Sequence, residues 1–334
     1  MRPEQAGLIA RACAVARLAI AGVGGPGRLG VSSARAMDAP LIDDLRATLA
    51  SADADVLLLA DPDDLGLPGD RSGADAVLEA RARGMTVASL EPIPSSAVDL
   101  AGGRWLSSAS GVRAVDVVRI VPITRRGGVA DDFSDVLDAF GPVRTLRVML
   151  DAPPTLGSLA ARAFDAFELI LGLLGEPESI DAAFVGPGSG PAVHAVPGET
   201  LRGLAGTLAA LVRTSDGRAA TISVSNAAPA DEASIVIFGP GGRLDVGNAG
   251  LRWLAPDGAV TDQNPPRPLA PEAEGDRGSD RLGRAIRAWL DTTRPPPAPV
   301  AVERVLASVQ AAVLSTRTGQ PESPATIRRM VGVE

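Results

Sequence analysis

Lysine and tyrosine do not occur in this sequence of 334 residues, so every one of its 32 basic side chains is an arginine. A guanidinium group stays protonated near neutral pH and therefore does not donate a proton to a reacting atom. The absence of lysine excludes every mechanism that needs a side-chain amine.

Cysteine and histidine occur once each, as Cys13 and His194. A single cysteine excludes an intramolecular disulfide framework and a cysteine-rich zinc site. A single histidine excludes a multi-histidine metal or acid–base cluster within one chain. We therefore expect no bound metal. A reducing compartment is the simplest fit to this cysteine content, and we predict a cytoplasmic location.

Acidic residues outnumber basic ones, which gives a net charge of −8 and a pI of about 4.9. This balance argues against a nucleic-acid partner, which would require a basic patch, and against binding to an anionic membrane surface. No apolar run reaches the length of a membrane-spanning helix. We predict neither nucleic acid nor membrane as a partner.

Alternating strand and helix patterns dominate the first part of the chain, whose length allows about two domains. Asp55–Ala60 is a continuous apolar run of the kind found in parallel sheets. Asp75–Arg83 is helical in pattern and ends at Gly84, and Met85–Leu90 is a second apolar strand. Strand, helix and strand at this spacing predict a parallel sheet. Leu41–Ala50 is a further predicted helix.

The second part of the chain has the pattern of an antiparallel β-meander. A long helix, Ser158–Leu174, is followed by strand-like runs between turns rich in Gly, Asp and Pro, which is typical of an antiparallel sheet. These runs are Ser179–Val185, Leu201–Thr214, Ala219–Ser225, Ser234–Phe238 and Leu251–Ala255. We divide the chain into a parallel-sheet domain (1–122), an antiparallel-sheet domain (123–300) and a C-terminal helix with its tail (301–334).

Three stretches together resemble the Gfo/Idh/MocA oxidoreductases by their order and spacing. They are DADVLLLADP with the following ADAVLEARARGMTVASLEP (Asp53–Pro92), AFDAFELILGLLGEPESIDA (Ala163–Ala182) and IVIFGPGGRLDV (Ile235–Val246). The resemblance implies a Rossmann-like α/β domain followed by an α+β domain with an open antiparallel sheet. It also implies NAD or NADP as cofactor and a small, sugar-like ligand.

The sequence departs from this family at the residues that carry its chemistry. The family's strand ends in Glu-Lys-Pro, whose lysine donates to the substrate hydroxyl, whereas this chain has Leu90-Glu91-Pro92. An ionised carboxylate does not stabilise a developing alkoxide. The family's His-x-x-Asp on the long helix is replaced by Asp165 and Glu168. Three residues apart, these two share a helical face, and they are either a rewired carboxylate site or a solvated surface.

The nucleotide-binding segment has two interpretations. By spacing, Pro3–Val15 is the first helix of the dinucleotide fold and Ala16–Ala21 its second strand, so the first strand would be missing or degenerate. In the rival register, Gly22, Gly24 and Gly27 form a G-x-G-x-x-G turn, although no acid at a predicted strand end follows about twenty residues on. The resemblance also places Asp61, Pro62 and Pro92 beside the cofactor.

Three functions follow from these features. The first is a divergent family member without ordinary dehydrogenase activity, which acts as a binding or partner subunit. The second is an NAD(P)-dependent oxidoreductase that acts on a sugar or polyol with its carboxylates, and the third is a purely structural protein.

The predicted second sheet also indicates an oligomer. In the runs Leu208–Val212 and Thr221–Ser225, the residues that point to either face of the sheet are aliphatic or small. We therefore predict a homo-oligomer that forms through this sheet.

Overall fold

The computed structural model describes residues 1, 3–24, 27–42, 44, 54–62, 65–66, 73–100, 105–106, 111–120, 131–186, 200–291 and 300–332. The predictions for His194 and for most of the helix Leu41–Ala50 lie outside these residues. Within the described part, no helix is both long and apolar enough to cross a bilayer.

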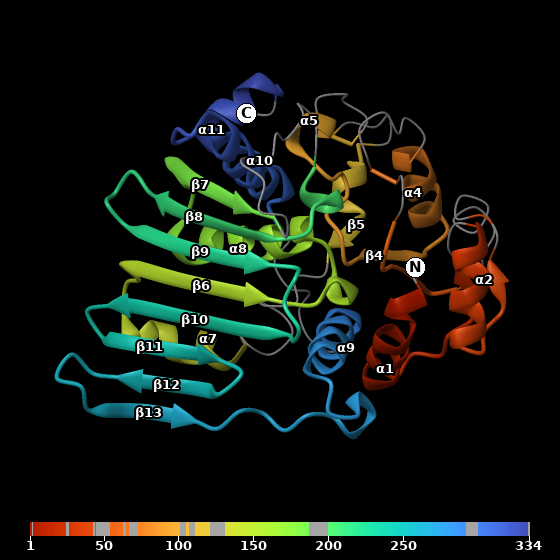
Figure 1. Ribbon diagram of the computed structural model, residues 1–334, viewed down its shortest axis with the longest axis horizontal. Coiled ribbons are helices and arrows are strands. Elements are labelled where there is room, and N and C mark those ends of the chain that lie inside the picture. Colours follow the sequence, from red (N-terminus) through yellow and green to blue (C-terminus); the bar gives the residue numbers. More distant parts are fainter. Residues whose placement is uncertain are drawn as a thin grey trace.

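The N-terminal domain consists of short parallel strands and helices (Figure 1). In chain order they are η1 (Pro3–Gln5), α1 (Ala6–Ala16), β1 (Val23–Gly24), α2 (Gly27–Ala36), β2 (Leu41–Ile42), β3 (Val56–Leu59), α4 (Gly73–Ala82), β4 (Thr86–Ser89), α5 (Ala97–Leu100), η2 (Ala114–Asp116) and β5 (Val118–Ile120). The order β3-β4-β5 is parallel throughout, and β1 pairs in parallel with β2 as a separate sheet. The predicted parallel sheet is confirmed.

Two N-terminal element predictions are wrong in part. The predicted strand Ala16–Ala21 does not form, because Arg17 adopts the left-handed conformation (φ 60°) and ends helix α1. The amides of Arg17 and Leu18 donate to carbonyls of α1, to Ala14 and Cys13, instead of to a neighbouring strand. The predicted helix from Leu41 begins instead as strand β2, which pairs with β1.

The C-terminal domain is built on one eight-stranded sheet of order β13-β12-β11-β10-β6-β9-β8-β7. Its strands are β6 (Thr145–Asp151), β7 (Ser179–Val185), β8 (Thr207–Arg213), β9 (Ala219–Ser225), β10 (Glu232–Gly239), β11 (Gly242–Gly247), β12 (Gly250–Leu254) and β13 (Val260–Asn264). Every neighbouring pair is antiparallel except β6 and β9. The sheet class is as predicted, with one parallel pair added.

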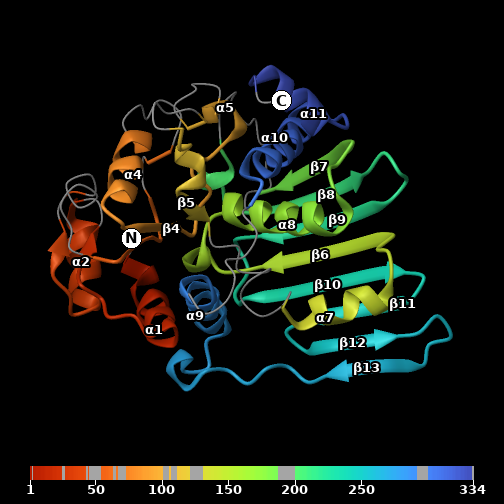
Figure 2. The ribbon, with the colours of Figure 1, turned by 180° about the vertical axis from the view of Figure 1, so that it is seen from behind.

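Helices cover one face of this sheet, as Figures 1 and 2 show from opposite sides. They are α7 (Asp131–Phe140), α8 (Leu159–Leu174) and α10 (Val302–Thr318). The domain also contains α9 (Arg277–Leu290), α11 (Pro324–Met330) and the short η3 (Pro154–Leu156), η4 (Leu201–Gly203) and η5 (Pro271–Ala273). Alternate residues such as Leu208, Ile222 and Ile235 point into the core beneath α8. None of the described helices covers the other face.

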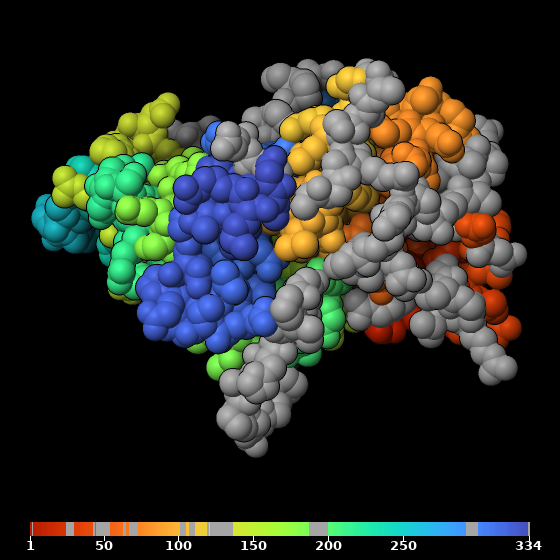
Figure 3. All heavy atoms as spheres, turned by 90° about the horizontal axis from the view of Figure 1, so that it is seen from above, coloured from red at the N-terminus to blue at the C-terminus, as the bar shows by residue number. Residues whose placement is uncertain are grey.

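Two sets of helices join the domains. Helix α10 contacts α5, and Arg113 of the N-terminal domain pairs with Glu303 of α10 (Nη1···Oε1 2.5 Å). From above, the C-terminal helices lie beside the N-terminal domain (Figure 3). On the other side, α1 packs along α9, and Arg11 of α1 pairs with Asp276 at the start of α9 (Nη2···Oδ2 2.8 Å).

The crossing of α1 and α9 depends on a glycine. A Cβ at Gly283 would lie 2.5 Å from Val15 Cβ and 2.6 Å from the Ala12 carbonyl oxygen. A backbone carbonyl cannot move aside as a flexible side chain can, so the helices approach this closely only with glycine here.

We predict that Gly283→Ala lowers the free energy of unfolding by about 1–3 kcal/mol, because the added methyl overpacks the crossing. Gly7→Ala is the matched control, since Gly7 is exposed on α1 and its Cβ would meet only Arg11 Nη1 at 3.4 Å. The control gains up to about 1 kcal/mol from helix propensity. Urea denaturation measures both, and equal effects of the two substitutions would contradict the tight crossing.

Candidate functional site

The carboxyl ends of β3 and β4 lie at the junction of the two domains. Asp61 and Pro62 follow β3, and Glu91 and Pro92 follow β4. Since β3 and β4 pair in parallel, both segments leave the sheet at the same edge. In open α/β sheets this edge is where ligands bind. The predicted residues that follow these two strands therefore meet at one place.

Glu91 is a buried acid, with 2% of its surface exposed. The Ser158 amide donates to its Oε1 (N···O 2.7 Å) and the Ser158 hydroxyl donates to its Oε2 (O···O 2.5 Å). Ser158 belongs to the C-terminal domain, so these hydrogen bonds cross the domain junction. Both oxygens of the carboxylate accept hydrogen bonds from protein donors.

Ser158 has this position because it caps helix α8. Its backbone is extended, and its hydroxyl oxygen accepts from the Ala161 amide, a typical N-cap arrangement. The helix N-terminus presents unpaired amides and a partial positive charge, which favour a carboxylate. Gly157, with φ 130°, precedes the cap, and a Cβ there would lie 3.7 Å from Glu91 Oε1. A local sequence signal, serine before an apolar helix, thus supplies the two hydrogen-bond donors for Glu91.

Arg202 also makes hydrogen bonds across this junction, from the C-terminal domain to the N-terminal domain. It lies in η4 of the C-terminal domain and donates from Nη2 to the Pro92 carbonyl (2.7 Å) and from Nη1 to the Leu65 carbonyl (3.2 Å). The charges of Glu91, Asp61 and Asp99 act on its guanidinium. One arginine of the second domain therefore faces three carboxylates of the first.

Burial sets the ionisation of these groups. Burial raises the pKa of the Glu91 carboxyl, while the hydrogen bonds from Ser158 and the charges of Arg202 and Arg162 oppose the rise. Burial likewise raises the pKa of Asp99 and lowers the pKa of Arg202. A raised pKa means that the neutral form of Glu91 is easier to reach than that of an exposed glutamate.

Asp165 and Glu168 both lie in the interior of α8, with 2% and 4% of their surface exposed. The interpretation of a solvated helix face is therefore wrong, because this face of α8 packs inward. Asp165 acts electrostatically on Arg281 of α9, whereas Glu91 interacts with Ser158 and Arg162 at the first turn of α8. Asp165 and Glu168 thus lie on α8 itself, and Glu91 contacts the residue that caps its N-terminus.

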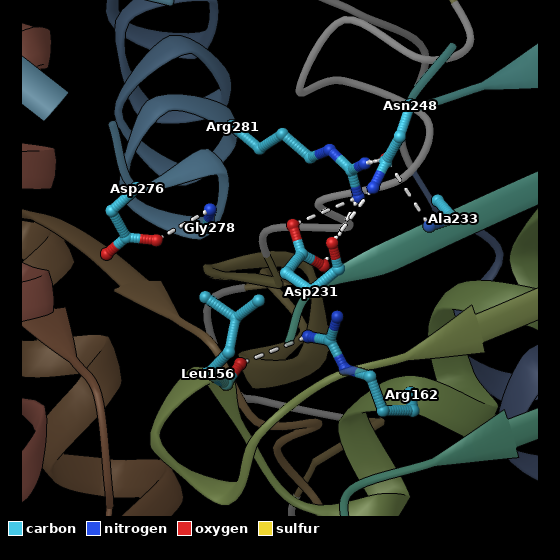
Figure 4. A network of polar contacts seen from close by, with 8 residues as sticks. All are labelled: Leu156, Arg162, Asp231, Ala233, Asn248, Asp276, Gly278 and Arg281. Carbon is cyan, nitrogen blue, oxygen red and sulfur yellow. Dashed lines mark hydrogen bonds and ion pairs between the residues drawn. The ribbon is translucent and has the colours of Figure 1, made fainter. Parts of the chain in front are cut away.

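A buried polar network joins α9 to the end of the sheet (Figure 4). Arg281 pairs with Asp231 (Nη1···Oδ2 3.2 Å) and donates to the side-chain oxygen of Asn248. Arg162 of α8 lies beside this network, and its charge, like that of Arg281, lowers the pKa of Asp231 against the raising effect of burial. Two arginine cations thus act on the single carboxylate of Asp231.

The glycine-rich turn lies apart from these residues. Gly22 precedes β1 and Gly24 is its last residue, and a Cβ on either would crowd Ile42 of β2, while Gly27 begins α2. Strand β1 pairs with β2 and with none of the other described strands, whereas the first strand of a dinucleotide fold is central. This pairing does not fit the rival register, in which Gly22, Gly24 and Gly27 would form the turn after a central first strand.

Sequence reasoning missed Ser158 as a partner of Glu91 and missed Arg202 entirely. The N-cap pattern could have indicated that the start of α8 would bind a carboxylate or another anion. No local signal marks Arg202, because its contacts are to carbonyls 110 and 137 residues away. Among the described residues, no group of three or more His, Cys, Asp or Glu side chains is placed to hold a metal ion.

No protein-family model matches this chain, and no curated protein matches it significantly. Solved structures do match over nearly the full length. Levoglucosan dehydrogenase in complex with NADH and levoglucosan has 14% identity and a TM-score of 0.64, covering 96% of this chain and 95% of its own. GenD2 from gentamicin A biosynthesis, in complex with NAD, has 17% identity and a TM-score of 0.63, covering 95% and 92%.

The WlbA dehydrogenase from Bordetella pertussis, in complex with NADH and UDP-GlcNAcA, also matches. It has 18% identity and a TM-score of 0.59, with 96% of this chain and 94% of that chain covered. At such identities the likeness establishes the fold. This chain has the two-domain fold of the Gfo/Idh/MocA-type dehydrogenases.

Proposed function

We propose that this chain is a divergent Gfo/Idh/MocA-type protein without ordinary NAD(P)-dependent dehydrogenase activity, which acts as a binding or partner subunit. The observation that carries this proposal is the environment of Glu91. It stands where the resembled family has its lysine, and both of its oxygens accept hydrogen bonds from Ser158. A carboxylate engaged in this way holds the domains together.

The chemistry of the remaining polar residues supports the proposal. Hydride transfer from an alcohol requires a group that takes up the hydroxyl proton. The chain has no lysine, and its arginines stay protonated. Asp165 replaces the family's histidine in the interior of α8, where Arg281 acts on it.

A rewired carboxylate site is the second candidate, and one observation favours it. Burial raises the pKa of Glu91, and a neutral carboxylic acid can donate a hydrogen bond to a substrate oxygen. Glu91 would then have to exchange a Ser158 hydrogen bond for one to the substrate. This candidate predicts an oxidoreductase that acts on a sugar or polyol.

The cofactor and ligand are proposed by resemblance. WlbA is seen with NADH and UDP-GlcNAcA, and levoglucosan dehydrogenase with NADH and levoglucosan. For this chain we propose that any nucleotide bound is NAD or NADP, held weakly, and that the small-molecule ligand is sugar-like. Asp61, Pro62 and Pro92 are the proposed cofactor contacts in the described part of the chain. We also propose a cytoplasmic location, because a single free and buried cysteine, Cys13, fits a reducing compartment.

We further propose a homo-oligomer through the uncovered face of the large sheet. Met149 and Val185 are exposed on this face at 37% and 68%, and Leu211 and Val236 are half-buried there. Small residues such as Ala209, Thr221 and Ser223 surround them, and Arg147 lies between Thr221 and Val236 on the same face. The apolar and small side chains of this face suit the same face of a second copy.

We predict that the purified protein, supplied with NAD or NADP, oxidises myo-inositol, glucose or levoglucosan no faster than a blank without protein. Loss of a positioned proton-transfer group typically lowers the rate by about 10² to 10⁴, and here both family groups are replaced. Absorbance of the reduced nicotinamide measures turnover. Turnover above the blank that Glu91→Ala abolishes would contradict this prediction and support the rewired site.

Binding of NAD and NADP to this chain should be no tighter than about 100 μM, as measured by titration calorimetry. A tight pyrophosphate site needs a central strand, a glycine-rich turn and a helix N-terminus in one place. Among the described strands, none pairs with both β1 and β3 to complete that arrangement. A dinucleotide that co-purifies with the protein would overturn this expectation.

Light scattering at micromolar concentration should show a dimer that Met149→Asp converts to monomer, because the new charge would be buried at the interface. Val98→Asp is the matched control, since Val98 is exposed at 45% on α5, away from the sheet. Ile222 and Val224 are unsuitable for this test, since both are buried beneath the helices. A monomeric wild-type protein, or a dimer unaffected by Met149→Asp, would refute the proposed interface.

A further inference from the structure

The domain junction contains two reciprocal contacts at the same edge of the parallel sheet. The acid Glu91, from the N-terminal domain, accepts from Ser158 of the C-terminal domain. The guanidinium cation of Arg202, from the C-terminal domain, donates to the carbonyls of Pro92 and Leu65 in the N-terminal domain. Each domain thus supplies one charged group to polar atoms of the other.

The two contacts are electrostatically coupled. The charge of Glu91 acts on Arg202, and that of Arg202 acts on Glu91, in the interior of the protein where water screens little. Charge-assisted hydrogen bonds are about twice as strong as neutral ones, so this pair contributes more than two ordinary contacts. Removing either charged group leaves the other buried with less compensation.

The position of these contacts gives them a consequence for ligands. Ligands of open α/β sheets bind outside the carboxyl ends of the strands, and here Arg202 bridges the segments that follow β3 and β4. The loop after β4 is itself held against the loop after β3, where the Ser95 amide donates to the Gly66 carbonyl (2.9 Å). A ligand approaching this edge meets the protein's own side chains.

We propose that Glu91, Ser158 and Arg202 form an interdomain clasp that holds the two domains together across the carboxyl ends of β3 and β4 and covers the edge at which ligands of such sheets bind. The clasp is carried by the hydrogen bonds that Glu91 and Arg202 make across the junction, and it is independent of whether the chain oxidises any substrate. It assigns a role to Arg202 and explains why a carboxylate occupies the end of β4.

Hydrogen–deuterium exchange read by mass spectrometry tests the clasp in the full chain. Arg202→Met keeps the apolar stem and removes the guanidinium donors. We expect exchange to rise about 10- to 100-fold in peptides that cover Ser158 to Phe164 and Leu90 to Ser96, as expected from losing charged hydrogen bonds. Arg213→Met is the matched control, because the Arg213 side chain is exposed on β8, and its exchange should equal that of wild type.

Glu91→Gln provides the second variant, which keeps the size of the side chain and removes the charge that holds Arg202. It should raise exchange in the same two peptides while the core strands of the large sheet stay protected. Unchanged exchange in both variants would overturn the proposal. A uniform rise over the whole molecule would also overturn it, because that result means general destabilisation rather than opening at the junction.

Discussion

The arrangement of the two domains depends on one buried carboxylate. Transferring an ionised group into a protein interior costs several kcal/mol unless it is hydrogen-bonded and opposed by charge. Glu91 meets that requirement at the start of helix α8. There the amide and hydroxyl of Ser158 donate hydrogen bonds to it, and the charges of Arg162 and Arg202 oppose its own. This contact helps to fix the parallel sheet against α8, together with the packing of α1 on α9 and of α10 on α5.

The same contact links the composition of the chain to its chemistry. The chain has no lysine and one histidine, and Asp165 stands where the resembled family has its histidine. Glu91 accepts hydrogen bonds from Ser158 across the domain junction, and the charge of Asp165 on α8 acts on Arg281 of α9. Fold similarity to dehydrogenases at 14–18% identity therefore describes the scaffold, and the site decides the function.

Sequence patterns predicted the elements whose signals are local. The helix ending at Leu174 and the strand Ala219–Ser225 were correct because apolar periodicity and a following glycine or turn define them. The strand predicted at Ala16–Ala21 failed because apolar residues alone do not show whether a pairing strand is present. The contacts of Glu91 and Arg202 were also beyond prediction, since they join residues 67 to 137 positions apart through packing of whole domains.

A double-mutant cycle between Glu91 and Ser158 tests the central claim most directly. Unfolding free energies of wild type, Glu91→Gln, Ser158→Ala and the double variant give the coupling between the two side chains, and the loss of the α8 cap cancels in the cycle. A structural carboxylate predicts a coupling of about 1–3 kcal/mol, typical of a charged hydrogen bond in the interior. Additivity within about 0.5 kcal/mol would show that Glu91 does not hold the domains together.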